Sequence, residues 1–251
     1  MKHFFVLSSL IIYMGTAMAQ NGRIETAVYA ISSDHMQKVI PMFSGAGSIL
    51  SKQSLTLHAL KHGKKFRFQT DTTGDELFFI IQDGPVEVQL NDRQYSLDKG
   101  SVVFVLPGDE VVFINRRKDH AFIYQMQMHA TGKNIQRGKQ AGASFAMDWN
   151  EMVFKPHDKG GVRQLFDRKT VMLNRFDIHI TTLNPGLKSH DPHTHVNEEI
   201  ILMMDGMGEM QLGNKKEKIT NGGAAWVESL IPHNITNIGK RPATYFAIQW
   251  N

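Results

Sequence analysis

Residues 185–206 read PGLKSHDPHTHVNEEIILMMDG and place three histidines and two glutamates at short spacing. Successive side chains of an extended strand point to opposite faces, so residues two apart share a face. His193 and His195 are therefore expected to point the same way. Glu199 follows four residues later, and we expect a bend or bulge to keep it on that side. The stretch predicts a strand that carries several ligands of one site.

A second run, from Pro232 to Asn237, contributes a further histidine, His233. Three imidazoles and one carboxylate suit a borderline divalent ion such as Mn, Zn, Fe, Ni, Co or Cu. Four ligands drawn from two strands leave positions open for water or substrate, which catalysis by a metal ion requires. We therefore predict a divalent-metal site, without a choice among these metals, with the ligands His193, His195, Glu199 and His233.

Around these ligands the chain consists of short β-branched and aromatic runs interrupted by Gly, Pro, Asn and Asp. Many short strands at close spacing predict an all-β sandwich or barrel. Helical periodicity is nearly absent, and a short helix is compatible with residues 145–152. The expected strands include Leu77 to Ile81, Val86 to Leu90, Val102 to Leu106, Val111 to Ile114, Ile178 to Leu183, Glu199 to Met204, Glu209 to Leu212, Ala224 to Val227 and Tyr245 to Trp250.

The two halves of the chain match each other at a constant separation, since Asp205 follows Asp83 by 122 positions and the other landmarks keep this offset. A constant offset over several landmarks predicts a duplication of one β unit of about a hundred residues. The matched landmarks are Asp83-Gly84 with Asp205-Gly206, Gly100 with Gly222, Val111 with His233, Asn115 with Asn237, and Gln127 with Gln249.

The start of the chain has the features of a signal peptide. Lys2 and His3 form a basic start, residues 4–14 are apolar, and Ala17-Met18-Ala19 is a small-x-small cleavage site. The apolar run is too short for a membrane span, and a buried N-terminal helix is the competing interpretation. We predict cleavage after Ala19 and a periplasmic or secreted protein without a membrane segment. The predicted units are the signal peptide 1–19, an N-terminal barrel 24–130, a polar linker 131–159 and a C-terminal barrel 160–251.

Composition and charge bound the function further. Hydrophobic residues make up 41% of the 251 positions, enough for globular cores, and the chain has no cysteine. Stability must therefore come from the barrel cores and not from disulfides. The net charge of +4 is spread over scattered basic residues without an ordered basic face, so nucleic acid is not an expected partner. The expected partner is a small molecule, and the chain is compatible with a monomer or a homo-oligomer.

The ligand pattern resembles the two motifs of the cupin superfamily. The first motif, G-x(5–6)-H-x-H-x(3,4)-E-x(6)-G, is matched from Gly186 to Gly206, and the second, a Gly, a Pro and then H-x(3)-N, from Gly222 to Asn237. The usual P-x-G-x-x-H spacing is absent, because Pro232 directly precedes the histidine. The resemblance covers both repeats. It implies two tandem cupin barrels, each a double-stranded β-helix or jelly roll, with a metal near the mouth of the second.

The N-terminal repeat lacks the ligand set. Subtracting 122 from the four ligand numbers leads to Asp71, Thr73, Leu77 and Val111, two of which are aliphatic. We therefore expect the first barrel to be free of metal and to serve a structural role, with a small ligand pocket of its own as the alternative.

Three further residues are candidates for catalysis or substrate binding. Asp177, His179 and Thr181 alternate with isoleucines, and either set is able to face the barrel interior. If the polar set faces inward, His179 is a candidate base or substrate contact. Gln249 is a candidate neighbour of the metal, and Arg175 a candidate for binding a substrate carboxylate.

Among cupins, the architecture is similar to that of the ureidoglycine aminohydrolase family. Shared features are a degenerate first barrel, closely spaced repeats and the phrase FDIHITTLNPG at 176–186. That family uses a Glu-x-His-x(3)-His stretch with a later Gln, whereas this chain has the common three-His, one-Glu set, so only the scaffold is carried over. We expect an exported enzyme whose metal acts as a Lewis acid on a small polar, anionic metabolite, such as a sugar acid or a ureidoglycine-like compound. Hydrolysis, isomerisation and elimination all fit.

Two other interpretations remain. One is an iron or copper dioxygenase of the quercetinase type, which also has two cupin barrels and a three-His, one-Glu set. The other is a non-catalytic module that binds a ligand or metal, because a fold by itself does not define an activity.

Overall fold

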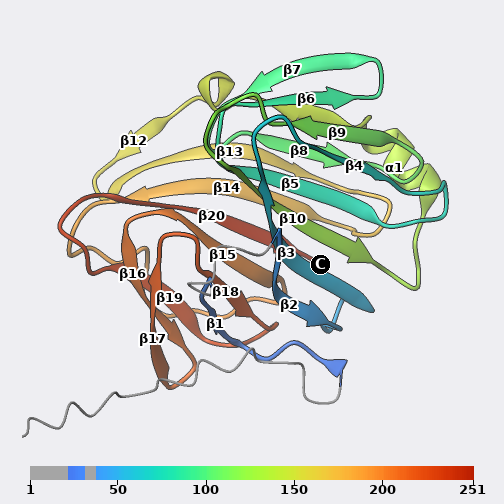
Figure 1. The fold of residues 1–251 in the computed structure, drawn as a ribbon. Coiled ribbons are helices and arrows are strands. Elements are labelled where there is room, and N and C mark those ends of the chain that lie inside the picture. The colour runs from blue at the N-terminus through green and yellow to red at the C-terminus, as the bar shows by residue number, and fades with distance from the viewer. Residues whose placement is uncertain (1–21, 32–37) are drawn as a thin grey trace, which may run out of the picture.

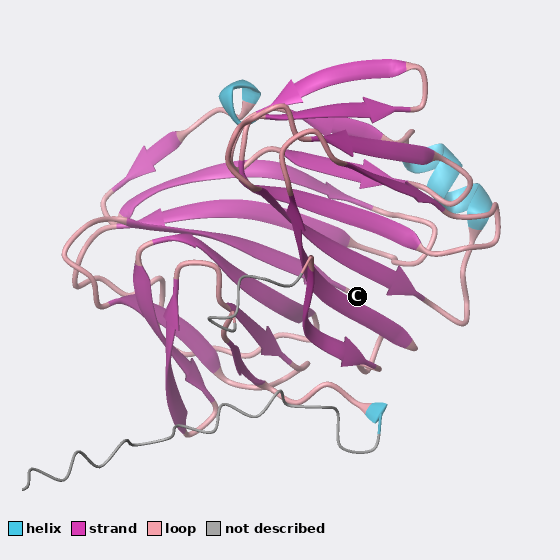
Figure 2. Ribbon diagram, in the orientation of Figure 1, coloured by secondary structure: helices cyan, strands magenta, loops and turns pink. Residues whose placement is uncertain are grey.

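The computed structural model describes residues 22–31 and 38–251. The predicted signal peptide, residues 1–19, lies outside this range. Within it, no helix is long and apolar enough to span a membrane. The described chain is built mainly of β-strands, as Figure 2 shows.

The first barrel pairs a large antiparallel sheet with a small one. Its strands are β2 (Val39–Gly45), β3 (Lys52–Leu60), β4 (Lys65–Gln69), β5 (Glu76–Asp83), β6 (Val86–Leu90), β7 (Arg93–Leu97), β8 (Val102–Val105), β9 (Glu110–Ile114), β10 (Ala121–His129) and β11 (Phe145–Met147). The large sheet has the order β11-β8-β5-β10-β3-β2, and the small sheet has the order β4-β9-β6-β7. The helix α1 (Ile135–Ala141) follows β10.

The second barrel repeats this plan. Its strands are β1 (Ala27–Tyr29), β12 (Lys155–His157), β13 (Gly160–Arg168), β14 (Phe176–Leu183), β15 (Glu198–Asp205), β16 (Met207–Leu212), β17 (Lys215–Thr220), β18 (Ala224–Val227), β19 (His233–Asn237) and β20 (Ala243–Trp250). The large sheet has the order β1-β18-β15-β20-β14-β13-β12, and the small sheet has the order β17-β16-β19. The fold is therefore all-β with two jelly-roll barrels in tandem, as the sequence predicted.

The two large sheets pack face to face in the middle of the molecule, and the small sheets lie on the outside (Figure 1). One apolar cluster joins the barrels. It contains Phe78 and Phe104 from the first barrel and Phe176, Trp226 and Trp250 from the second. Fully burying a large apolar side chain contributes about 1.5–3 kcal/mol, so this shared layer holds the barrels together.

Strands β5 and β15 read as continuous apolar runs because both of their faces are buried. In β15, Ile200 and Leu202 belong to the shared cluster, whereas Ile201 and Met203 belong to the cluster inside the second barrel. An uninterrupted apolar run of this length is the signature of a strand buried on both faces.

The duplication is visible in side-chain detail. The buried Asn115 amide donates to the carbonyls of Leu60 and Asp119 and accepts from a backbone N–H two residues on. Asn237, 122 positions later, makes the same three kinds of bond, to Leu183, Arg241 and Gly239. A buried amide with both ends satisfied stabilises the turn after β9 and β19 in the same way.

The segment before the first barrel adds a strand to the second barrel, and the segment between the barrels adds a strand to the first. The N-terminal strand β1 pairs with β18 of the second barrel, and β11 pairs with β8 of the first. The range 131–159, expected as a polar linker, thus contains α1 and two paired strands, β11 and β12. The helix considered for 145–152 is wrong in type: β11 occupies 145–147 because it pairs with an open sheet edge, and only a 3-10 turn (Trp149–Glu151) follows.

Candidate metal centre

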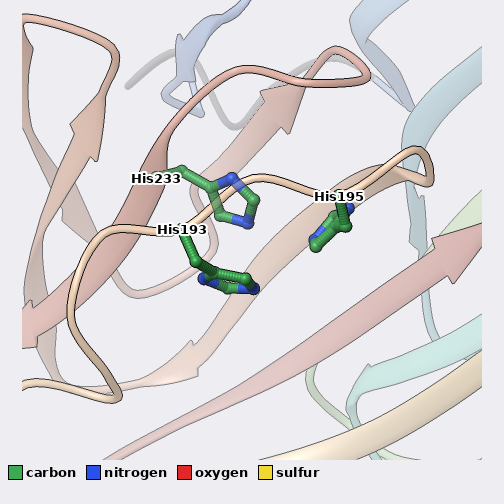
Figure 3. A group of neighbouring side chains, drawn as sticks. All are labelled: His193, His195 and His233. Atoms are coloured by element: carbon green, nitrogen blue, oxygen red, sulfur yellow. The ribbon is translucent and has the colours of Figure 1, made fainter.

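Three histidine rings of the second barrel lie close to one another, as Figure 3 shows. One nitrogen from each of His193, His195 and His233 lies within 4.8 Å of the other two. Donors that are each about 2.1 Å from one ion lie roughly 3–4 Å from one another, so the cluster is close to the spacing of a metal site. The predicted histidine ligands are brought together by the fold.

The backbone positions these rings differently from a simple strand. His193 forms an isolated antiparallel bridge with His233, the first residue of β19. His195 lies in the loop before β15, where its carbonyl accepts from the Leu230 N–H at 2.8 Å. The shared facing of His193 and His195 therefore comes from long-range pairing with β19 and its preceding loop, and not from strand alternation.

Hydrogen bonds to carbonyl groups orient two of the rings. His195 Nδ1 lies 2.9 Å from the Asn197 carbonyl, and His233 Nδ1 lies 2.8 Å from the Ile231 carbonyl. Because a carbonyl only accepts, each Nδ1 carries the proton and each Nε2 is left with a lone pair. Holding the outer ring nitrogen in this way is the usual arrangement of a metal-binding histidine.

Glu199 completes the group from the start of β15. Its Oε2 lies 2.8 Å from His233 Nε2 and 3.7 Å from His195 Nε2. Gln249 Nε2 donates to Glu199 Oε1 at 3.0 Å, and Gln249 Oε1 accepts from Asn197 at 3.3 Å. Gln249, predicted as a neighbour of the metal, thus holds one carboxylate oxygen and turns the other toward the histidines.

The electrostatics favour the ligand forms of Glu199 and His193, an ionised carboxylate and a neutral imidazole. Burial alone would raise the pKa of Glu199 and lower that of His233, but their contact reverses both effects, so the Glu199 pKa is lowered and the His233 pKa raised. Desolvation, followed by the nearby His190 and His233, lowers the pKa of His193. The carboxylate is therefore ionised and His193 neutral at physiological pH.

These residues fit a divalent ion. Among the described residues, the buried Nε2 atoms of His195 and His233 have no hydrogen-bond partner of acceptable geometry. Buried polar atoms without a partner are costly, and coordination of a metal would remove that cost. The donor set of three imidazoles and one carboxylate is the one predicted from the sequence.

A cavity of about 320 Å³ opens onto this cluster. Binding sites for small molecules range from about 300 to 1,000 Å³, so the cavity suits a small metabolite. Its wall includes Lys159 and His157, which come from the β12–β13 hairpin at the end of the predicted linker, and Tyr245. His190, whose ring centroid lies 4.1 Å from that of His193, also lines it. None of these four residues was predicted from the sequence. For Lys159 and His157, only the return of the hairpin to the barrel mouth reveals a role in the site.

Of the three other predicted site residues, two line the cavity and one does not. His179 and Gln249 line the cavity, and Ile178 and Ile180 are buried in the shared core, so the polar set of β14 faces inward. Arg175 is outside the lining of this cavity: its guanidinium is bound by Asp167 and Asp177. A role for Arg175 in binding a substrate carboxylate stays a prediction, and two carboxylates, from β13 and β14, already bind its guanidinium.

The corresponding positions of the first barrel are packed. Leu77 and Val111, which replace Glu199 and His233, are fully buried in an apolar cluster with Phe79. Apolar groups supply no metal-ligand atoms. The absence of metal from this barrel stays a prediction.

The fold and the site define a protein of two cupin barrels with a candidate metal centre in the second. A cupin-domain family profile matches residues 179–249, which contain all four predicted ligands. This part of the chain is therefore a cupin domain. A comparison with curated protein sequences gave no match.

Solved structures share the whole architecture. AerE from Microcystis aeruginosa is 11% identical with a TM-score of 0.66, covering 90% of this chain and 100% of AerE. Ylba from E. coli is 14% identical with a TM-score of 0.67, covering 93% and 95%. Oxalate decarboxylase from Lactobacillus farciminis, solved as a formate complex, is 12% identical with a TM-score of 0.67, covering 92% and 87%. At these identities the likeness shows the fold alone.

Proposed function

We propose that the protein is an exported, divalent-metal-dependent enzyme that acts on a small carboxylate-bearing metabolite. The observation that carries this proposal is the pair of buried Nε2 atoms of His195 and His233, which have no hydrogen-bond partner of acceptable geometry. His233 lies in the wall of a cavity that also includes Lys159. The proposal of export depends on the predicted signal peptide. The scaffold similarity to ureidoglycine aminohydrolase stays a prediction.

The charge of the cavity favours an anion. Three neutral imidazoles and the Glu199 carboxylate would leave one positive charge on a bound divalent ion. Among the described lining residues, Glu199 is the only carboxylate and Lys159 the only ammonium group. A cavity with a net positive charge concentrates anionic substrates.

The residues of the chain divide the work. His193, His195, Glu199 and His233 would hold the ion, which supplies Lewis acidity to a carbonyl, carboxylate or water. Lys159 Nζ, which donates to the Ser189 carbonyl at 3.0 Å, is positioned to bind a substrate carboxylate. His179 is half-buried in the lining and is the candidate for moving a proton in hydrolysis, isomerisation or elimination.

Replacing Lys159 with methionine is expected to weaken binding of malonate to the metal-loaded protein. Loss of a hydrogen bond to a charged group costs about 1.5–3 kcal/mol, which corresponds to about a tenfold to hundredfold rise in Kd. The measurement is isothermal titration with malonate and, for comparison, with the neutral malonamide. The Lys159→Met variant should bind malonamide as the wild type does.

Lys188→Met is the matched control, because Lys188 is exposed, pairs with Asp191 and is outside the cavity lining. Its malonate affinity should stay within about twofold of wild type. Equal malonate affinities for the two lysine variants, or no malonate binding by the wild type, would contradict an anionic substrate.

Elemental mass spectrometry of the protein purified from its native compartment tests the metal itself. We expect close to one manganese or zinc ion per chain, and turnover that persists without oxygen. Iron or copper together with oxygen consumption would favour the dioxygenase alternative instead. A chain that carries no divalent metal would contradict the proposal.

A further inference from the structure

Two buried glutamates at equivalent positions, Glu76 in β5 and Glu198 in β15, each reach into the opposite barrel. Both side chains are inaccessible to solvent, and their positions differ by the repeat offset of 122. A buried carboxylate is tolerated only where several donors surround it. Each carboxylate accepts at least one hydrogen bond from the other barrel, so each glutamate links the two barrels.

Glu76 of the first barrel is held by the segment that precedes β14. Thr170 Oγ1 donates to Glu76 Oε2 at 2.6 Å, the Val171 N–H donates to Oε1 at 2.6 Å, and the Met172 N–H donates to Oε2 at 3.0 Å. Glu76 has no predicted metal ligand next to it in the sequence. The position that corresponds to Glu199 in the first barrel is occupied by Leu77.

Glu198 of the second barrel is held by the loop that precedes β3. The Ser48 N–H donates to Glu198 Oε1, and Trp250 Nε1 donates to Oε2 at 3.0 Å. A Cβ atom at Gly47 would lie 2.3 Å from Glu198 Oε1, so the glycine permits this close approach. Ser48 Oγ also donates to Glu228 Oε1 at 3.1 Å, which gives the loop a second contact with the metal-bearing barrel.

Glu198 and Glu228, the two residues that Ser48 contacts, both lie close in sequence to groups that orient the predicted ligands. Glu198 stands between Glu199 and Asn197, whose carbonyl accepts from His195 Nδ1. Glu228 begins the loop that continues to Ile231, whose carbonyl accepts from His233 Nδ1. The loop of the first barrel therefore contacts the two segments that orient the histidine rings.

We propose that Glu198 is a positioning residue of the metal centre and that the first barrel, through Gly47 and Ser48, is the rigid support for the ligands. The inference rests on the proposed function, because it concerns the same metal site. It assigns the ligand-free barrel a role in metal affinity. A ligand whose supporting contacts are lost binds its metal about 10- to 100-fold more weakly.

The test compares Glu198→Gln with Glu76→Gln in the full chain. Glutamine has the same shape as glutamate, but in each variant an amide NH₂ group would face N–H donors. Both variants should therefore lose a similar amount of thermal stability. Metal affinity is measured by isothermal titration of the metal-free proteins with Mn²⁺, at a temperature at which circular dichroism shows each variant folded.

We expect the Kd for Mn²⁺ to rise about tenfold or more in Glu198→Gln and to change less than about twofold in Glu76→Gln. Ser48→Ala, which removes one exposed hydroxyl and is expected to fold, should give a smaller rise in Kd through Glu228. Equal effects of Glu76→Gln and Glu198→Gln, or wild-type affinity in both Glu198→Gln and Ser48→Ala, would overturn the inference while the proposed function stands. A wild-type chain without affinity for Mn²⁺, Zn²⁺ or Fe²⁺ would overturn both.

Discussion

Replacing His193 and His195 together with alanine is expected to weaken divalent-metal binding by more than about a hundredfold while the protein stays folded. Loss of a partner that only orients a ligand already costs 10- to 100-fold, and here two ligands are removed. The buried pair of His233 and Glu199, 2.8 Å apart, remains intact, so no carboxylate is left without a partner. Titration with Mn²⁺ or Zn²⁺ measures the loss directly.

Thermal unfolding gives an independent measurement. A ligand at a hundred times its Kd stabilises the folded state by about 2.7 kcal/mol, so added metal should raise the Tm of the wild type but not of the double variant. His190→Ala is the matched control, because His190 lines the cavity beside His193 but is outside the three-histidine group. An equal loss of metal affinity in His190→Ala, or wild-type affinity in the double variant, would contradict the predicted ligand set.

Replacing Phe176 with alanine is expected to lower the free energy of unfolding by about 3–5 kcal/mol, because a large buried aromatic leaves a cavity. The ring is fully buried, and its centroid lies 5.5 Å from Phe166, 5.7 Å from Phe78 and 6.1 Å from Phe104. Phe78 and Phe104 belong to the first barrel, so the cavity would weaken the layer that both barrels share. The two barrels should therefore unfold in a single transition.

Urea unfolding followed by tryptophan fluorescence and by circular dichroism tests both statements. Trp226 and Trp250 are buried in the shared core, so their fluorescence reports on that layer. Phe154→Ala is the control, because 39% of the Phe154 residue is exposed, and it should cost less than about 1.5 kcal/mol. Separate transitions for the two probes would contradict a shared core. So would a decrease of less than about 1 kcal/mol in the free energy of unfolding of Phe176→Ala, where about 3–5 kcal/mol is expected.

The repeat and the strands were predictable because they depend on local pattern. Short apolar runs with turn residues between them are visible in the sequence, and the 122-position offset carries through to the matching bonds of Asn115 and Asn237. The candidate donor set was predictable for a similar reason, since histidines and a glutamate at these spacings match a metal-ligand motif. The cupin fold and a candidate histidine cluster followed from these features.

The cavity wall was less predictable, because strand alternation does not say which face is inside. Ile178 and His179 alternate in β14, and both faces are covered: one by the opposite barrel and the other by the barrel's own interior. Arg175 was a candidate for binding a substrate carboxylate, and no local pattern indicated that Asp167, on the neighbouring strand, binds its guanidinium. Lys159 had no local signal, since a lysine before a glycine turn is typical of any exposed hairpin.

Residue type and spacing along the chain were enough to predict the two β units, their repeat and a candidate ligand set. The tertiary structure alone decided that His193 meets His233, that Lys159 enters the cavity, and that the first barrel holds Glu198. These contacts join segments up to 150 residues apart in the sequence, as Ser48 and Glu198 are. Their partners are set by how two sheets pack face to face, and sheet packing depends on the whole arrangement of strands and not on any one segment.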